Sequence, residues 1–129
     1  MQVKFEQLEE GYEFPSTTYT LNPEAVSKYR EAVGETPPPE TASVSPMAIA
    51  AYGMTALSQA LSLPPGAIHT AQEMEFIKLV PLGTTITCRA RVVQKQARAR
   101  FRMLAVEINI CDQNNEPVLV EKTTLILPE

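Results

Sequence analysis

An apolar segment at residues 46–61 is the feature that most constrains the fold of this chain. Ser45 and Pro46 open it, and a serine at the N-cap followed by a proline in the first turn is typical of a helix start. The segment is apolar on almost every side, so such a helix must be enclosed by the rest of the fold or by lipid. At ~1.5 Å per residue it spans about 24 Å, which is shorter than the ~30 Å hydrocarbon core of a membrane. We therefore expect a helix in a protein interior.

Alternating patterns follow the helix after a break at Pro64-Pro65-Gly66. Alternation of apolar and polar residues indicates strands with one buried face. We expect strands at about residues 68–76, 85–92, 104–110 and 118–127, with a turn at 112–117. In the first of these strands, His69, Glu73 and Glu75 share one parity, and we expect them on the same face of the sheet.

The N-terminal part predicts one further strand and a short helix. The strand is expected at about residues 12–20, and Asn22-Pro23 begins an amphipathic helix that Gly34 ends. One curved antiparallel sheet wrapped around the apolar helix satisfies the burial of both elements. The sequence therefore predicts a single α+β domain over residues 1–129, without a repeat or a second domain.

Composition argues against several classes of protein. A net charge of -4 and a pI near 5.1 disfavour nucleic acid and anionic membranes as partners. Residues 1–10 lack the features of a signal peptide, so we expect a cytoplasmic protein. Cys88 and Cys111 lie in apolar alternating stretches and are expected to be buried, reduced thiols. With His69 as the one histidine, we expect no metal site. The 5 glycines never cluster into a phosphate-binding loop, and we expect no cofactor.

Several short motifs, in matching order and spacing, resemble the MaoC-like family of enoyl and 3-hydroxyacyl thioester hydratases and dehydratases. Residues 34–40 read Gly-Glu-Thr-Pro-Pro-Pro-Glu where the family carries G-D-x-N-P-I-H. Tyr52-Gly53-Met54 is similar to its H-G-M, and residues 76–84 are similar to its F-x-x-P-V-x-x-G-D. Residues 66–76 resemble the H-x-x-Q-E-x-E-[FY] segment of N-terminal halves of double hot-dog dehydratases, which often shape the substrate tunnel. The resemblance covers about residues 12–129 and implies a hot-dog fold.

The resemblance places Glu35 at the aspartate and Glu40 at the histidine of the family's acid/base pair. Hydration of an enoyl thioester needs a proton donor or acceptor, a group that activates water, and donors for the enolate oxygen. Two carboxyl groups do this only where proximity or burial raises one pKa. The alternative is a solvated pair in a proline-rich loop. His69 is a second candidate base, with substrate contact or a surface role as alternatives. The resemblance also implies that Tyr52 and Gly53 lie near the thioester.

Basic residues concentrate between Phe76 and Val106, where seven of the 11 Lys and Arg lie and no acid occurs. Arg98 and Arg100 are candidates to bind the phosphates of coenzyme A or the acidic surface of an acyl carrier protein. The alternative is a solvated outer sheet face that discourages edge pairing. Nucleic acid is disfavoured because Phe101 is the only aromatic residue among these arginines.

A short domain with one helix and one sheet leaves a sheet edge and part of the helix uncovered, so we expect side-by-side dimerisation. The partner is a second copy or a separate catalytic hot-dog subunit. The leading hypothesis is a hydratase or dehydratase that binds an acyl thioester in a tunnel at the dimer interface. The alternative is a non-catalytic hot-dog subunit. A thioesterase of the same fold ranks last, because the 46–61 helix carries no acidic residue.

Overall fold

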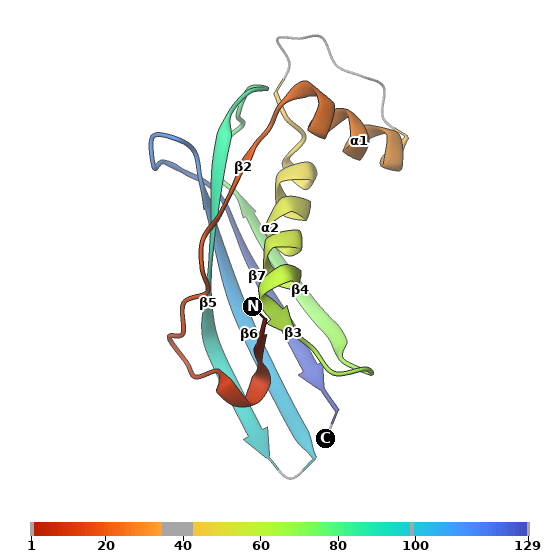
Figure 1. The fold of residues 1–129 in the computed structure, drawn as a ribbon, viewed down its shortest axis with the longest axis vertical. Coiled ribbons are helices and arrows are strands. Elements are labelled where there is room, and N and C mark those ends of the chain that lie inside the picture. The colour runs from red at the N-terminus through yellow and green to blue at the C-terminus, as the bar shows by residue number, and fades with distance from the viewer. Residues whose placement is uncertain (1, 35–42, 99, 129) are drawn as a thin grey trace.

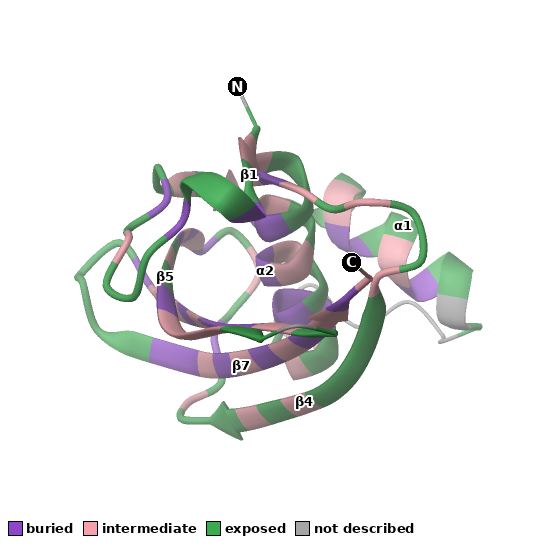
Figure 2. Ribbon diagram, turned by 90° about the horizontal axis from the view of Figure 1, so that it is seen from below, coloured by how far each residue is buried: buried purple, intermediate pink, exposed green. Residues whose placement is uncertain are grey.

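The computed structural model describes residues 2–34, 43–98 and 100–128, and it contains one antiparallel sheet curved around a central helix (Figure 1). The strand order is β2-β5-β6-β7-β4. These strands are β2 (Thr17–Thr20), β4 (Ile68–Phe76), β5 (Thr85–Arg98), β6 (Phe101–Cys111) and β7 (Pro117–Leu127). The central helix is α2 (Pro46–Ala60), and it lies on the concave face of the sheet (Figure 2). The expected α+β architecture is confirmed.

The N-terminal segment closes one end of this structure. Strand β1 (Val3–Lys4) pairs in parallel with β3 (Leu61–Ser62), directly after α2, and a 3-10 turn, η1, spans Phe5–Gln7. Lys95 of β5 donates through Nζ to the backbone oxygens of Phe5, at 3.0 Å, and Leu8, at 2.7 Å. The same ammonium lies 4.5 Å from the centre of the Phe5 ring. These contacts attach the N-terminus to the long sheet strands.

Local signals place the two helices where the sequence predicts them. Helix α1 (Pro23–Val33) begins after Asn22, whose side chain accepts from the Ala25 amide at 2.8 Å, and it ends at Gly34 in the left-handed conformation. Helix α2 begins at Pro46 as expected. Ser45 occupies its N-cap position, but the Ser45 side chain makes no capping hydrogen bond, in contrast to the expectation.

The expected strand at residues 12–20 is shorter than predicted. Regular pairing with β5 begins only at Thr17, and the chain before it is held by an isolated bridge from Glu13 to Arg91 and by single hydrogen bonds such as Phe14 N to Ala90 O at 2.9 Å. Pro15 interrupts the strand because proline has no N–H to donate to a ladder. In contrast, β5 and β6 run several residues further than expected and form a long hairpin.

The core lies between α2 and the concave face of the sheet. Burial alternates along β7 and the second half of β6 (Figure 2), and because successive residues of a strand point to opposite faces, the buried ones face the helix. The buried residues of α2 are Ala48, Ile49, Ala50, Gly53 and Leu57. One sheet covers only one side of this helix, so part of α2 is uncovered in the single chain, as expected for so short a domain. Its exposed residues are Met47, Ala51, Thr55, Ser58 and Gln59.

Strand β4 contains a β-bulge that changes which residues share a face. His69 pairs with Leu125, whereas Ala71 pairs with Thr124, so Thr70 is the extra residue. The bulge places His69 on the concave face together with Gln72, opposite to Glu73. The expectation that His69 shares a face with Glu73 and Glu75 is therefore wrong.

Both cysteines are free thiols, with Cys88 buried and Cys111 partly exposed. Burial, with the Glu121 carboxyl nearby, raises the pKa of Cys88 to about 12. Within the described ranges, no helix has the length and apolar character needed to cross a membrane. The same residues contain no group of three or more His, Cys, Asp or Glu side chains placed to hold a metal ion.

Candidate functional site

A buried carboxyl group lies directly beneath the central helix. Glu121 is on β7 and has the same parity as Leu119 and Leu125, so its side chain points into the core, where it is 0% exposed. A Cβ atom added to Gly53 of α2 would lie 2.3 Å from Oε2 of Glu121. Real Cβ atoms do not come so close, so a glycine at this turn of the helix makes room for the carboxyl group.

The environment of Glu121 disfavours the ionised form of its carboxyl group. Burial raises the pKa of Glu121 to about 7, and a hydrogen bond from Gln72 acts in the opposite direction. Its Oε2 atom is buried and has no hydrogen-bond partner among the described residues. Buried polar atoms without partners are rare and costly, and perturbed acids of this kind gather at functional sites. Glu121 is therefore a functional candidate.

Gln72 of β4 connects Glu121 to two other side chains. Gln72 Nε2 donates to Glu121 Oε1 at 3.1 Å, and Thr123 Oγ1 donates to Gln72 Oε1 at 2.7 Å. His69 Nε2 lies 2.8 Å from the same Gln72 Oε1. We call these four residues, His69, Gln72, Glu121 and Thr123, the Glu121 cluster. It runs from the exposed edge strand β4 to the buried floor beneath α2.

A small hollow of about 70 Å³ adjoins this cluster, between α2 and β7. It is lined by Met54, Leu57, Ser58, Leu61, Leu63, Thr123 and Leu125. Thr123 belongs to both the hollow and the cluster. Leu125, another lining residue, is the cross-strand partner of His69. The arrangement combines an apolar hollow with a few converging polar groups, as small-ligand sites do, although its volume is well below the ~300–1,000 Å³ usual for such sites. We call it the α2 hollow.

A wider groove of about 420 Å³ lies between the two helices. It is lined by Ala25, Lys28, Tyr29, Ala48, Ala51, Tyr52 and Thr55. The ring of Tyr52 packs against that of Tyr19, with centroids 4.8 Å apart. Burial raises the pKa of both phenols, so both stay neutral hydrogen-bond donors at physiological pH.

The structure brings together some of the residues predicted from the sequence. Gly53 contacts the Glu121 cluster, His69 belongs to it, and Tyr52 lines the helix groove. Glu35 and Glu40 lie outside the described residues.

Arg98 and Arg100 are exposed at the tip of the β5–β6 hairpin, at the lower end of the molecule in Figure 1. Tyr19, which contacts Tyr52, pairs with Ile86 of β5, and Arg98 is twelve residues further along that strand (98 minus 86). At ~3.3 Å per residue this is about 40 Å. Within one chain these arginines and Tyr52 therefore do not share a small ligand.

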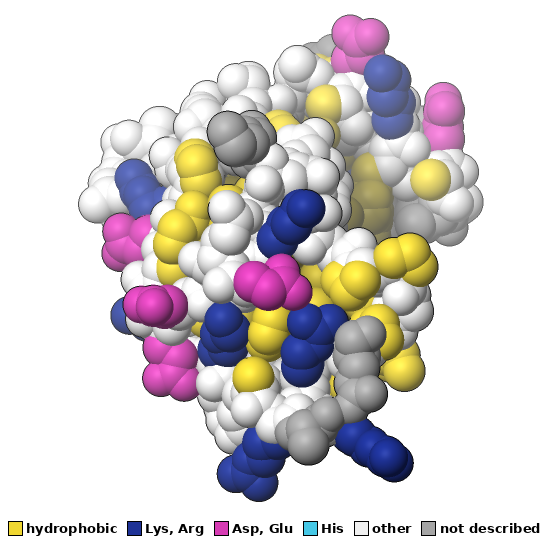
Figure 3. All heavy atoms as spheres, turned by 60° about the horizontal axis from the view of Figure 1, so that its bottom comes forward, with side chains coloured by type: hydrophobic (Ala, Val, Ile, Leu, Met, Phe, Trp, Pro, Cys, Tyr) yellow, Lys and Arg dark blue, Asp and Glu magenta, His cyan; other side chains and the backbone are white. Residues whose placement is uncertain are grey.

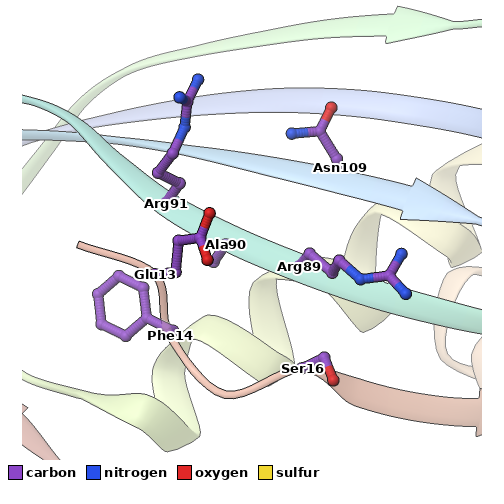
Figure 4. Close-up of a pocket in the computed structure, with 7 residues that line it drawn as sticks. All are labelled: Glu13, Phe14, Ser16, Arg89, Ala90, Arg91 and Asn109. Carbon is purple, nitrogen blue, oxygen red and sulfur yellow. The ribbon is translucent and has the colours of Figure 1, made fainter. Parts of the chain in front are cut away.

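On the face shown in Figure 3, the described basic side chains are interspersed with acidic ones. Lys and Arg side chains gather towards the lower end of this view, and Asp and Glu side chains lie at the middle of the face and along its left side. A second hollow of about 420 Å³ on the sheet is lined partly by Arg89, Arg91 and Asn109 (Figure 4). Glu13 also lines it, and Arg91 lies 3.6 Å from Glu107. Glu107 partly neutralises Arg91, and Glu13 adds a negative charge to the lining, which weakens the case for phosphate binding there.

Sequence reasoning missed Gln72, Glu121 and Thr123. The parity of the last strand contained a signal, because Glu121 and Thr123 alternate with Leu119, Leu125 and Leu127 and so occupy core positions. A charged residue at a predicted core position indicates a buried polar site.

The chain has the hot-dog fold, a curved antiparallel sheet around one central helix. Solved structures confirm the expected resemblance to MaoC-like proteins at the level of the fold. R-hydratase PhaJ1 from Pseudomonas aeruginosa matches with a TM-score of 0.78 at 16% identity, over 97% of this chain and 85% of that chain. A MaoC-like dehydratase from Rhodospirillum rubrum matches with a TM-score of 0.76 at 18% identity, over 96% of this chain and 95% of that chain. A chain of the HadBC (3R-hydroxyacyl-ACP dehydratase) complex from Mycobacterium tuberculosis matches with a TM-score of 0.68 at 15% identity, over 91% of this chain and 96% of that chain. The sequence itself matches no protein-family model and no curated protein.

Proposed function

We propose that this protein binds an enoyl or 3-hydroxyacyl thioester, carried by coenzyme A or an acyl carrier protein, and acts as a hydratase or dehydratase. The observation that carries this proposal is the Glu121 cluster beside the α2 hollow, where an apolar site meets an acid whose pKa burial raises to about 7. Buried acids with a perturbed pKa gather at functional sites, and this one is hydrogen-bonded through Gln72 to the exposed His69. The hydratases and dehydratases that share the fold support the same chemistry.

Dimerisation through β4 is part of the proposal. This nine-residue strand pairs only with β7 among the described strands, so its other edge presents open backbone groups. Ile68, at 59% exposure, and Leu79, at 64%, flank that edge together with Ile77. An open strand edge flanked by exposed apolar side chains is a ready template for pairing with another chain. A β4–β4 pair would place His69 and the α2 hollow close to the dimer interface.

The second candidate function is that of a non-catalytic hot-dog subunit. The observation that favours it is that Glu35 and Glu40 replace the family's aspartate and histidine. The match to the HadBC complex also supports a partner of the same fold. In both readings we assign Arg98 and Arg100 to contacts with the carrier or with a partner chain.

Turnover by the purified chain tests the proposal. A short and a long 2-enoyl-CoA are supplied, the loss of the enoyl absorbance is followed, and binding is measured in parallel. Glu35→Gln, Glu40→Gln and His69→Ala are assayed beside wild type, with Glu73→Gln as a control on the outer face of β4. Turnover that one of the three variants abolishes supports an enzyme. Binding without turnover supports the non-catalytic subunit, and the absence of both contradicts the proposal.

A further inference from the structure

We infer that Glu121 and Gln72 are positioning residues that hold His69 with a proton on Nε2 and its bare Nδ1 directed to the ligand. This inference rests on the proposed function, because it names the group that exchanges a proton with the thioester ligand. It assigns no catalytic contact to Glu121 or Gln72. Their role is to fix the tautomer and the direction of the one histidine in the chain.

The first step concerns the direction of the Gln72 amide. Its nitrogen lies 3.1 Å from Glu121 Oε1 and 3.7 Å from Met54 Sδ, both of which are acceptors. An ionised carboxyl only accepts hydrogen bonds, and a protonated one still accepts at the oxygen that carries no proton, so in either state Oε1 can accept from the NH2 group of Gln72 while the amide oxygen faces away. Glu121 in turn is fixed by its place against Gly53, where no side chain competes for the space.

The second step concerns the proton on His69. Gln72 Oε1 can only accept, and its two neighbours are Thr123 Oγ1, at 2.7 Å, and His69 Nε2, at 2.8 Å. His69 Nε2 must therefore donate in this contact, while the single Thr123 hydroxyl proton is directed to Gln72 Oε1 or to Met54 Sδ, which lies 3.2 Å away. A neutral imidazole has one N–H, so a proton on Nε2 leaves a lone pair on Nδ1. A hydrogen bond at one ring nitrogen commonly fixes the tautomer of a functional histidine, so that the other nitrogen keeps its lone pair for a ligand or a proton.

The third step concerns where the imidazole stands. The bulge at Thr70 turns His69 to the concave face, beside Leu125, which lines the α2 hollow. His69 itself is exposed, so a ligand can reach it, whereas Glu121 is fully buried. A ligand whose acyl chain fills the α2 hollow would therefore pass the imidazole.

This arrangement is suited to general-base hydration. Nδ1 takes a proton from water while the water oxygen bonds to C3 of the enoyl group and the π electrons move to the thioester oxygen. The imidazolium then returns the proton to C2 as the enolate collapses, so that water is added overall and the histidine is regenerated. General-base contributions are ~100-fold or more, so His69→Ala should lower kcat by about that factor.

Nitrogen-15 NMR of the histidine tests the inference without any substrate. With one histidine in the chain, the long-range correlations of the imidazole nitrogens need no assignment. At a pH where the ring is neutral, we expect one tautomer with Nε2 protonated and Nδ1 bare. Glu121→Leu and Gln72→Leu should relax the ring to the mixture found for an unrestrained imidazole. Glu121→Gln, which keeps an acceptor for the Gln72 amide, should retain the wild-type pattern.

A proton on Nδ1, or a tautomer mixture in the wild-type protein, would overturn the inference even if the leucine variants fail to fold. A single tautomer that survives Gln72→Leu in folded protein would also overturn it. A titration with 2-butenoyl-CoA then separates the two proposals. Binding that leaves the His69 nitrogens unchanged refutes the role of Nδ1 and keeps the proposed function. If nothing binds, the proposed function fails, and the tautomer result alone decides whether the positioning is real.

Discussion

The buried Glu121 should make this protein less stable as the pH rises through the range where most proteins are most stable. Its pKa is raised from 4.5 to about 7 in the folded state, so the folded protein binds more protons than the unfolded chain between these values. Stability is therefore greatest below the unfolded pKa, falls as the pH rises towards 7, and levels off above it. A difference of about 2.5 pKa units corresponds to about 3 kcal/mol at 1.36 kcal/mol per unit.

Urea denaturation of wild type and Glu121→Gln, at several values from about pH 4 to about pH 8, measures this effect. The variant carries no titrating group at position 121, so the difference between the two proteins isolates the contribution of Glu121. We expect wild type to lose about 3 kcal/mol relative to the variant over that range. Glu73→Gln, at an exposed carboxyl on the outer face of β4, should track wild type. If the free energies of unfolding of wild type and Glu121→Gln changed in parallel with pH, the raised pKa of Glu121 in the folded state would be refuted.

Three further predictions concern the packing and the open edge. Gly53→Ala should cost about 1–3 kcal/mol in urea unfolding, because its Cβ would meet the carboxyl of Glu121, and much of that cost should disappear in a Glu121→Ala background. Lys78→Met should lower the melting temperature more at neutral than at acidic pH, since Lys78 binds two carboxylates that acid neutralises, and equal losses would contradict this. Leu79→Lys should shift the protein to monomer in sedimentation, while Phe101→Lys at the distant hairpin tip should not, and a dimer that tolerates Leu79→Lys would exclude this edge.

Much of the fold follows from short-range signals in the sequence. The proline after Ser45 and the Pro-Pro-Gly break after Leu63 place the central helix to within one residue of its observed end at Ala60. Alternation along residues 104–110 identifies the core face of β6, because each of its inward residues is apolar. These signals lie within a few residues of the structure they determine, so they can be read without knowing the partner strands.

The Glu121 cluster depends on pairings that lie far apart in the sequence. Gly53 and Glu121 are 68 positions apart (121 minus 53), and neither residue indicates the other. The bulge at Thr70 arises from the register of β4 on β7. Simple alternation along the strand, which ignores this bulge, places His69 on the outer face with Glu73 instead of on the concave face. For this reason the sequence identified His69 as a candidate but missed Gln72, which anchors it.

Calorimetric titration of the purified chain with 2-butenoyl-CoA and, separately, with unacylated coenzyme A is the most direct test of acyl-thioester binding. The α2 hollow and the Glu121 cluster recognise the acyl part of the ligand, so the thioester should bind detectably more tightly than coenzyme A alone. His69→Ala should weaken the advantage of the thioester and leave the weak binding of coenzyme A unchanged. Equal affinity for the two ligands, or no binding of either, would contradict the account.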